Sequence, residues 1–269
     1  MAIILDGKML RDKIFESLKA KLDKMQQKPT LAVILVGENP ASQIYVRNKK
    51  KTAEKLGINS LSIEYPSDIS EEELLNKIKE LNSDEKVTAI LVQLPLPAHI
   101  NKNRIIDAIL PQKDVDGLTP YNLGKLFSGE EPYVYPCTPK GILLLLDEYN
   151  IKLEGKNIVV VGRSNLVGKP VAQMLLKRNA TVTMCHSHTK NLSEITKTAD
   201  IIVSAVGKKV IGEKMLKSDC VVIDVGIFIG DGKVMDNIGV VRVTTLDDWI
   251  ATFCKHHPVG FGFPPNVQR

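Results

Sequence analysis

The chain has 269 residues, of which 43% are hydrophobic and 25% are charged, and its formal net charge is +5 at pH 7. These proportions are those of a soluble globular protein with one large domain or two of moderate size, and they exclude a disordered chain. No basic stripe is interleaved with the few aromatic residues, and no apolar run approaches the ~20 residues of a membrane span. The composition therefore indicates neither a nucleic acid nor a membrane as a partner.

Strands and helices alternate through the first part of the chain. After an opening strand, an apolar stripe from Leu10 to Met25 predicts an amphipathic helix. Ser42 is the expected N-cap of a helix that ends before Gly57, and Ser70 begins another helix with a capping-box sequence. Buried strands are predicted at residues 30–37 and 87–97, a further strand at 60–66, and these two helices at residues 41–57 and 70–81.

Residues 111–139 interrupt this alternation with a loop-rich sequence, which predicts a domain boundary. We expect one domain at residues 1–138 and a second at residues 139–269. In the second, a helix is predicted at 140–149, one beginning at Pro170 and one near 192–198, with strands at 157–162, 180–185, 200–207 and 220–226. The pattern predicts an α/β fold of parallel sheets with helices on both faces, and its second part a doubly wound unit.

The four cysteines are far apart and form no Cys-x-x-Cys pair. Neither a disulfide framework nor a zinc site is indicated, and we expect no bound metal. The N-terminal sequence "MAIILDGKMLRDKI" is neither a signal peptide nor a transit peptide, because charges follow its short apolar run at once. The expected location is the reducing cytoplasm.

The stretch "VVVGRSNLVGKP", residues 159–170, nearly matches two phosphate-binding signatures. It does not fit a mononucleotide P-loop, because Gly162 and Gly168 are too far apart and Pro170 replaces the hydroxyl residue. It fits the dinucleotide fingerprint partly, with Ser164 at the middle glycine. A buried strand before the glycines and a helix after them favour nucleotide binding, and a strand-to-helix turn without a ligand is the alternative.

The end of the next strand indicates which dinucleotide would bind. NAD enzymes keep an acidic residue there to hold the ribose 2′-hydroxyl, but this strand ends as Cys185-His186-Ser187-His188. The Ser187 hydroxyl can donate to a 2′-phosphate, and Arg163 can pair with it bidentately. NADP is therefore predicted rather than NAD.

The first half carries a second group of candidate residues. Tyr45 and Lys49 share one face of the predicted helix, Gln93 ends a buried strand at the edge where such sheets bind ligands, and "KDVDG" places Asp114 and Asp116 in the next loop. A lysine transfers protons only when its pKa is lowered towards neutrality. Taken singly, the lysine run could be a solvated face and the loop an ordinary glycine turn.

Together these residues resemble one known family, the bifunctional methylenetetrahydrofolate dehydrogenase/methenyltetrahydrofolate cyclohydrolases. The resemblance lies in the order and spacing of several motifs over roughly residues 1–234. They are "YVRNKKK" from Tyr45, "VQLPLP" from Val92, "KDVDG" from Lys113, "PCTPKG" from Pro136, "GRSNLVGKP" from Gly162, "TVTMCHSHT" from Thr181 and "DVGI" from Asp224.

The resemblance implies an N-terminal folate domain and a C-terminal NADP-binding Rossmann domain that face each other across a cleft, usually in a homodimer. Tetrahydrofolate derivatives would be the substrates, oxidised from the 5,10-methylene to the 5,10-methenyl form and then hydrolysed to 10-formyltetrahydrofolate. By the family pattern Lys49 is the central catalytic residue, Tyr45 orients the folate, Gln93 tunes Lys49 and Asp116 anchors the pterin. The implied cofactor contacts are Gly162, Arg163, Ser164, Gly168, Pro170, Ser187 and Ile227, with Thr138 near the nicotinamide.

After about Val234 the sequence departs from the family pattern as we interpret it, and the expected final helix is absent. We expect the tail to be a replaced or out-of-frame segment that weakens the folate site or the dimer. Two alternatives to the bifunctional enzyme follow. One is a folate and NADP binder with impaired turnover, and the other is a Rossmann oxidoreductase acting on a small acid, in which Tyr45, Lys49, Gln93 and Asp116 would have no joint purpose.

Overall fold

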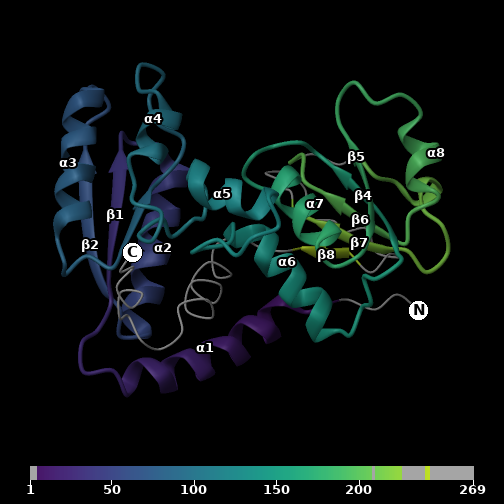
Figure 1. Cartoon of the computed structure of the whole chain (residues 1–269), viewed down its shortest axis with the longest axis horizontal. Helices are drawn as coiled ribbons and strands as arrows, with labels where there is room; N and C mark the ends of the chain where they lie inside the picture. The colour runs from purple at the N-terminus through teal and green to yellow at the C-terminus, as the bar shows by residue number, and fades with distance from the viewer. Residues whose placement is uncertain (1–4, 208–209, 226–239, 243–269) are drawn as a thin grey trace, which may run out of the picture. The chain divides into compact units, whose positions relative to one another are not determined.

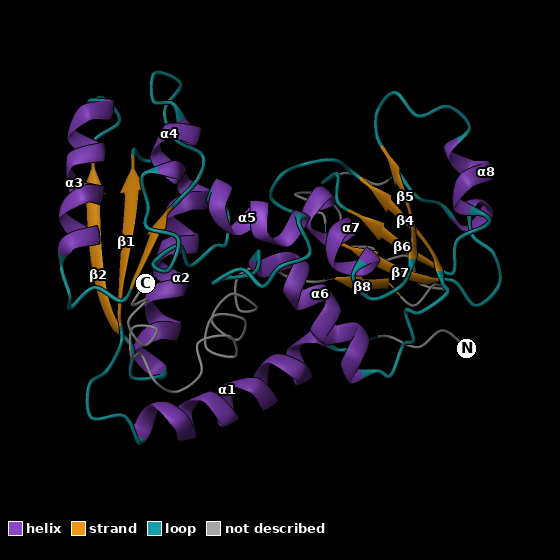
Figure 2. Cartoon of the chain, in the orientation of Figure 1, coloured by secondary structure: helices purple, strands orange, loops and turns teal. Residues whose placement is uncertain are grey.

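The computed structural model describes residues 5–207, 210–225 and 240–242 (Figure 1). Contacts divide the described chain into two compact units. One unit holds Lys13–Leu123 and Pro132–Val134, and the other holds the described residues up to Asp12, Gly124–Glu131 and those from Tyr135 onward. Each unit is built on its own parallel sheet, as Figure 2 shows, which confirms the predicted α/β class.

The first unit has a three-stranded sheet in the order β2-β1-β3. Every strand pair is parallel, with Ile34 of β1 opposite Ile63 of β2 and Val92 of β3. The sequence predicted all three strands. Their bounds are Thr30–Val36 for β1, Asn59–Tyr65 for β2 and Ala89–Val92 for β3, and the helices are α2 (Pro40–Lys55), α3 (Glu71–Ser83) and α4 (Lys102–Asp107). The helix α1 (Gly7–Asp23) is divided between the two units, with its residues from Lys13 onward in the first.

Alternate residues of β1 and β3 enter a core that α3 and α4 cover. Ile34 and Ile90 pack there with Ile78 of α3 and Ile105 of α4, and all four are buried. α2 contacts both β1 and β2, and its residues Val46 and Ala53 are buried. β1 and β3 are therefore almost wholly apolar, whereas β2 carries polar residues and is only partly buried.

The ends of α2 show one wrong expectation and one correct one. Asn39, not Ser42, is the N-cap, and its side chain accepts a hydrogen bond from the Ser42 N–H at 3.0 Å. Pro40 then occupies the first turn, where a missing N–H costs nothing. Gly57 follows the C-cap with φ of +76°, as predicted. In α3, Ser70 caps Glu73 N–H at 3.1 Å, also as predicted.

The predicted loop at residues 111–139 is not free of helices. It contains α5 (Pro120–Phe127) and the first residues of α6 (Cys137–Glu148). The Thr119 hydroxyl accepts the Asn122 N–H at 3.4 Å, and Pro120 begins the helix, which is a recognisable start signal. Sequence analysis missed this Thr-Pro signal because the surrounding glycines and prolines are typical of loops.

The second unit has a five-stranded parallel sheet in the order β5-β4-β6-β7-β8. Its strand directions confirm the doubly wound prediction, because the chain goes from β4 to one neighbour, β5, and then across to the other, β6. The carboxyl end of β4 is thus the point where the winding changes direction. The strands are β4 (Asn157–Val161), β5 (Thr181–Cys185), β6 (Ile201–Ser204), β7 (Val221–Asp224) and β8 (Val240–Arg242).

The helices of this unit differ from their predicted bounds by a few residues. α7 (Gly168–Leu176) begins two residues before Pro170, which lies in its first turn, and α6 begins at Cys137 rather than residue 140. The remaining elements are α8 (Leu192–Thr196) and the short 3-10 helix η1 (Glu213–Met215). Within the described ranges, no helix is long and apolar enough to cross a membrane. The opening strand and most of the tail lie outside the described residues.

Candidate active site

Two predicted site residues of the first unit meet directly. The Lys49 amine donates a hydrogen bond to the Gln93 side-chain oxygen at 3.3 Å, although the two residues are far apart in sequence. Gln93 also donates from its amide nitrogen to the Leu94 carbonyl at 2.7 Å. The oxygen of Gln93 is therefore fixed towards the lysine, and the contact brings α2 to the carboxyl end of β3.

The helix α2 presents Lys49 differently from its neighbours in the run Lys49-Lys50-Lys51. Lys49 is partly buried, whereas Lys50 and Lys51 are exposed. Tyr45 lies one turn earlier on the same helix and is also partly buried. The interpretation of the whole run as a solvated face is thus wrong for Lys49, and the structure supplies the neighbouring amide that the sequence predicted for it.

The "KDVDG" loop separates its two aspartates into different environments. Asp114 is 2% exposed, and its carboxylate accepts hydrogen bonds from Thr119 N–H at 2.8 Å and from the Asn122 side chain at 2.9 Å. Asp116 is only partly buried. Gly117 follows with φ of +68°, so the turn predicted at this glycine is present.

Lys113 anchors the start of this loop to α3. Its amine donates to the carbonyls of Leu81, Asn82 and Asp84 at 2.8–2.9 Å, which covers the carboxyl end of that helix. Burial lowers the pKa of Lys113, and the charges of Asp84 and Glu85 oppose this shift. Sequence analysis did not identify this anchor.

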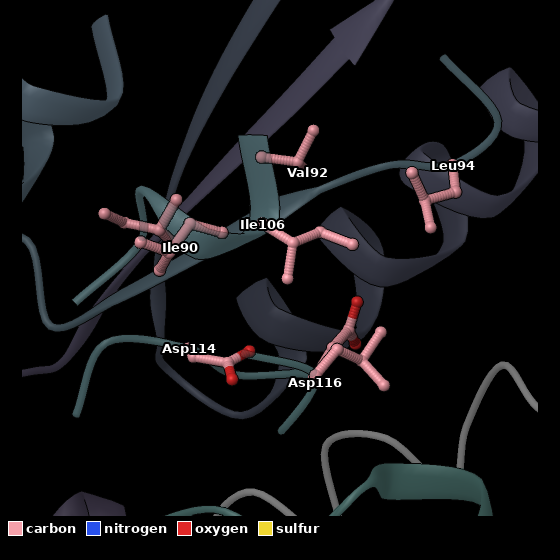
Figure 3. Close-up of a pocket in the computed structure, with 8 residues that line it drawn as sticks. Ile90, Val92, Leu94, Ile106, Asp114 and Asp116 are labelled. Carbon is pink, nitrogen blue, oxygen red and sulfur yellow. The ribbon is translucent and has the colours of Figure 1, made fainter. Parts of the chain in front are cut away.

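A small, partly open pocket lies beside the end of β3 (Figure 3). Apolar side chains from β3 and α4 face the two carboxylates of the loop across it. The residues on either side of Gln93 in sequence both line the pocket. The complete lining is Ile90, Val92, Leu94, Ile106, Ile109, Asp114, Asp116 and Leu118. Asp116 is therefore placed at the same strand end as Gln93.

In the second unit, the predicted phosphate turn joins β4 to α7. Gly162 has φ of +125°, and a Cβ on it would lie 2.6 Å from the Ala205 carbonyl oxygen. A Cβ on Gly168 would lie 2.2 Å from the Gly162 carbonyl oxygen. Both glycines are thus required by the close approach of backbone to backbone, as the fingerprint implies.

Ser164 closes this turn from within. Its hydroxyl accepts the N–H of Val167 at 3.2 Å and of Gly168 at 3.4 Å, so it caps the start of α7. Its carbonyl accepts the Lys169 N–H at 3.0 Å. The residue that replaces the middle glycine of the fingerprint therefore shapes the turn, which the sequence alone did not reveal.

Arg163 and Ser187 follow two strands that pair side by side. Val161 of β4 is in register with Cys185 of β5, and each predicted cofactor residue comes two positions later. Both side chains are exposed. No carboxylate lies between residues 185 and 191. The carboxyl edge of this strand pair therefore offers a guanidinium and a hydroxyl without an opposing acid.

The turn that carries Ser187 is closed by reciprocal hydrogen bonds. Thr189 N–H donates to the His186 carbonyl at 2.9 Å, and His186 N–H donates to the Thr189 hydroxyl oxygen at 2.8 Å. The His186 ring accepts the His188 N–H through Nδ1 at 3.2 Å. Burial raises the pKa of the adjacent Cys185 thiol. The reciprocal bonds hold Ser187 in a defined turn.

The remaining predicted site residues are spread more widely. Pro170 is buried in the first turn of α7, and Thr138 is partly buried in the first turn of α6. Ile227 lies outside the described residues. In the described part of the chain, no group of three or more histidine, cysteine or acidic residues could hold a metal ion.

Two family models match the chain in order. The tetrahydrofolate dehydrogenase/cyclohydrolase catalytic domain matches residues 5–116, and the NAD(P)-binding domain of the same family matches residues 136–262. This chain belongs to the tetrahydrofolate dehydrogenase/cyclohydrolase family. The first match contains Lys49, Gln93 and Asp116, and the second contains the whole glycine turn.

Curated members of this family are similar over most of their length. The bifunctional protein FolD of Ligilactobacillus salivarius is 50% identical over 255 residues, which cover 93% of this chain and 89% of that protein. The FolD protein of a Sulfurihydrogenibium species is 53% identical over 242 residues, 88% of this chain and 85% of its own. These matches confirm the family that the motifs indicated.

Solved structures of family members share the fold. The bifunctional FolD enzyme of Campylobacter jejuni is 43% identical with a TM-score of 0.90, covering 95% of this chain and 97% of that chain. The Trypanosoma brucei enzyme, solved with NADP and an inhibitor, is 31% identical with a TM-score of 0.87 and covers 95% of each chain. An NAD-dependent enzyme of Saccharomyces cerevisiae is 19% identical with a TM-score of 0.81. At that identity only the fold is comparable, and the fold alone does not select the cofactor.

The family pattern continues beyond Val234, contrary to our interpretation of the sequence. The second family model extends to residue 262, and β8 pairs in parallel with β7 in the sheet. The expected loss of pattern after residue 234 is therefore wrong. The expected absence of the family's final helix falls on residues outside those described. None of the findings supports the alternative of a folate and NADP binder with impaired turnover.

Proposed function

We propose that this chain oxidises 5,10-methylenetetrahydrofolate with NADP and hydrolyses the resulting 5,10-methenyl compound to 10-formyltetrahydrofolate. The observation that carries this proposal is the hydrogen bond between Lys49 and Gln93 at the end of β3, within the part of the chain that matches the family's catalytic domain. A solvated lysine would make no such contact. The relatives include enzymes with both the dehydrogenase and the cyclohydrolase activity. The contact with Gln93 marks Lys49 as the residue for the cyclohydrolase step.

For the dehydrogenase step, the first unit is proposed to hold and orient the folate. Asp116 lies at the pocket beside β3, where its carboxylate can accept hydrogen bonds from the N–H groups of a pterin. Tyr45 offers a partly buried ring on the same face of α2 as Lys49. When bound, NADP supplies the acceptor for the hydride that leaves the one-carbon bridge. The protein's contribution to this step is mainly to align donor and acceptor.

For the cyclohydrolase step, Lys49 is proposed as the base. A water oxygen bonds to the methenyl carbon while one water proton passes to the Lys49 amine. The hydroxyl on that carbon then loses its proton as the formyl C=O forms, while the bond from the carbon to N5 breaks and N5 keeps the electron pair and takes up that proton. The formyl group stays on N10, and the Lys49 ammonium releases its proton to solvent. The amine must be uncharged when water attacks. Gln93 can orient it without the negative charge that would stabilise the ammonium form.

The residues of the second unit fit NADP. The glycine turn lies at the point where the sheet's winding changes direction, and its glycines have no room for a Cβ. Arg163 and Ser187 extend from neighbouring strand ends, where no acid would repel a 2′-phosphate. We assign the 2′-phosphate to these two residues, and the pyrophosphate side of the turn to Gly162, Ser164, Gly168 and Pro170. Thr138 is assigned to the nicotinamide side, and Ile227 to a further contact with NADP.

The finer organisation of the enzyme is also a proposal. We assign folate chemistry to residues 1–138 and dinucleotide binding to residues 139–269, a division supported by family matches that end at 116 and resume at 136. We propose a homodimer in the cytoplasm. Free thiols at Cys137, Cys185 and Cys220 suit a reducing compartment. Sedimentation of the purified protein at several concentrations tests the dimer.

The function is tested by following both reactions on the purified protein. NADPH formation with methylenetetrahydrofolate reports the dehydrogenase, and decay of methenyltetrahydrofolate absorbance in the absence of NADP reports the cyclohydrolase. Lys49→Gln is expected to lower cyclohydrolase turnover at least about 100-fold, the usual contribution of a positioned proton-transfer group. Lys50→Gln is the matched control, because Lys50 is the next residue and is exposed.

The control is expected to retain both activities within about twofold, the size of effect typical of surface substitutions. Normal cyclohydrolase turnover in Lys49→Gln would show that this lysine is not the base. Absence of both reactions in the wild type would refute the proposed function itself.

A further inference from the structure

One buried acid in the first unit has no part in the proposed chemistry. Asp114 is 2% exposed, and its neighbour in space, Asn122, is 0% exposed. Burying a carboxylate costs several kcal/mol unless hydrogen bonds replace its lost water. An apolar residue would fill the same space without this free-energy cost. The buried carboxylate at the wall of the pocket therefore needs an explanation other than packing.

The contacts of this pair form what we call the Asp114–Asn122 hub. One carboxylate oxygen of Asp114 accepts both the Thr119 N–H at 2.8 Å and the Asn122 amide N–H at 2.9 Å. The same Asn122 nitrogen donates to the Pro111 carbonyl at 2.9 Å. The Asn122 oxygen accepts the Tyr133 N–H at 3.1 Å. The hub therefore connects parts of the chain at Pro111, Asp114, residues 119–122 and Tyr133. No β-sheet hydrogen bonding joins these parts to one another.

The loop is fixed on both sides of Asp116, by β3 on one side and by the hub on the other. On the N-terminal side, Ile90 N–H of β3 donates to the Lys113 carbonyl at 2.8 Å, and Ile90 and Asp114 form a parallel bridge. On the C-terminal side, the Thr119 N–H is held by the Asp114 carboxylate. Only the short segment from Val115 to Leu118 lies between these two fixed points. The direction of the Asp116 side chain is thus set by the strand on one side and by the hub on the other.

We propose that the Asp114–Asn122 hub is a positioning device for the folate ligand, which acts by holding Asp116 at the pocket beside β3. This inference rests on the proposed function, because it takes Asp116 as the group that meets the pterin. Asp114 and Asn122 are positioning residues and do not touch substrate. A misplacement of a binding group by about 1 Å is enough to cost up to about 100-fold in an enzyme reaction, so the rigidity of this loop has a direct effect on folate use.

The test uses Asp114→Asn in the full-length protein. The variant keeps the size of the side chain but removes its charge and one acceptor, so Thr119 N–H and Asn122 lose part of their shared partner. The KM for methenyltetrahydrofolate is expected to rise about 10-fold or more, with kcat within about threefold and the Kd for NADP unchanged. Asp107→Asn is the matched control, because Asp107 is exposed on α4 beside the same pocket, and it is expected to match the wild type.

A double substitution separates positioning from a direct role. If Asp114 acts through Asp116, then Asp114→Asn has little further effect on KM when Asp116→Ala is already present, so the two effects are strongly non-additive. Additive effects would overturn the proposal. Asn122→Ser serves as a second variant, because it leaves the Asp114 charge in place, and a smaller rise in KM is expected.

The proposal and the proposed function fail in different ways. A wild-type enzyme that neither binds nor converts folate refutes the function. A folate-active wild type in which Asp114→Asn has an unchanged KM refutes the hub alone. A third outcome is that both Asp114→Asn and Asn122→Ser lower the melting temperature and weaken folate use, kcat and NADP binding to the same extent. That result would show that the two residues are merely structural and would overturn the proposed positioning role.

Discussion

The two units build their sites in contrasting ways. In the three-stranded unit, side chains do the work and are held by other side chains: Lys49 by Gln93, and the Asp116 loop by Asp114 and Asn122. In the five-stranded unit, the two glycines of the turn, Gly162 and Gly168, are buried and closely packed, while Arg163 and Ser187 are exposed. A reaction on a substrate requires functional groups held in fixed positions. Dinucleotide binding instead requires a backbone turn that fits the ligand, and polar side chains that can stay exposed until the ligand buries them.

This contrast predicts different sensitivities to substitution. In the nucleotide unit, adding one carbon to the turn should be more damaging than removing an exposed charge. In the folate unit, small changes in hydrogen bonding should affect kinetics while NADP binding is preserved. The following predictions test that difference, beginning with the largest expected effect.

Gly168→Ala is expected to abolish measurable NADP binding and to destabilise the protein by about 3 kcal/mol, near the upper end for overpacking. The new Cβ would lie 2.2 Å from the Gly162 carbonyl oxygen, a backbone atom that cannot move aside alone. Isothermal titration and thermal unfolding measure the two effects. Gly124→Ala is the matched control, because a Cβ there meets nothing within 4 Å, and an alanine in helix α5 should be slightly stabilising. Native NADP affinity in Gly168→Ala would contradict the close-approach account.

Arg163→Ser is expected to raise the KM for NADP about 10-fold to 100-fold, because a hydrogen bond to a charged group contributes about 1.5–3 kcal/mol. The KM for NAD should hardly change, so the preference between the two cofactors narrows. Cyclohydrolase turnover of supplied methenyltetrahydrofolate should stay within about twofold, the range for a change far from its chemistry. Lys169→Ser, an exposed cation in the first turn of α7, is the comparison. Equal losses with NAD and NADP would remove Arg163 from the 2′-phosphate site.

The smallest effect concerns stability rather than binding. The Asp200 carboxylate accepts hydrogen bonds from Lys217 at 2.5 Å and from the Asn157 N–H at 2.8 Å, and these partners, Lys217 first, lower the pKa of Asp200. A carboxyl whose pKa is lower in the folded state stabilises the protein above its ordinary pKa of 3.8 and loses that contribution as the pH falls through the folded value. Asp200→Asn should therefore cost less than about 1 kcal/mol at pH 7.

The difference between Asp200→Asn and the wild type should shrink steadily in acid below pH 3.8. Urea unfolding at several pH values measures it, with Glu213→Gln as an exposed control in the same unit. A difference that stayed constant into acid would show that the charge of Asp200 contributes nothing.

The sequence predicted most strands and the glycine turn because these depend on local patterns. A run such as "TLAVILV" must be buried on both faces, and a glycine must stand where a Cβ cannot fit, whatever the rest of the chain does. Starts of helices were predicted less well. Two helix starts depend on the point at which the backbone enters the helix, which the sequence pattern does not specify. One is the N-cap of α2, at Asn39 rather than Ser42, and the other is the start of α7 before Pro170.

The Asp114–Asn122 hub could not be predicted for a different reason. Its partners Pro111, Thr119 and Tyr133 all lie within the segment 111–139, which the sequence described as loop. Only the path of the folded chain brings the Thr119 N–H to the Asp114 carboxylate, and the Pro111 carbonyl and Tyr133 N–H to the Asn122 side chain. The pairing of Lys49 with Gln93 was implied by the family resemblance, and the structure adds the hydrogen bond between them at 3.3 Å.

A double-substitution cycle between Lys49 and Gln93 tests the central claim most directly. Cyclohydrolase kcat is measured for the wild type, Lys49→Gln, Gln93→Leu and the pair. The account predicts that Gln93→Leu lowers kcat about 10-fold in the presence of Lys49, consistent with a coupling of at least about 1 kcal/mol between residues in contact, and has no further effect once Lys49 is replaced. An equal loss in both backgrounds would show that the two residues act separately and would contradict the account.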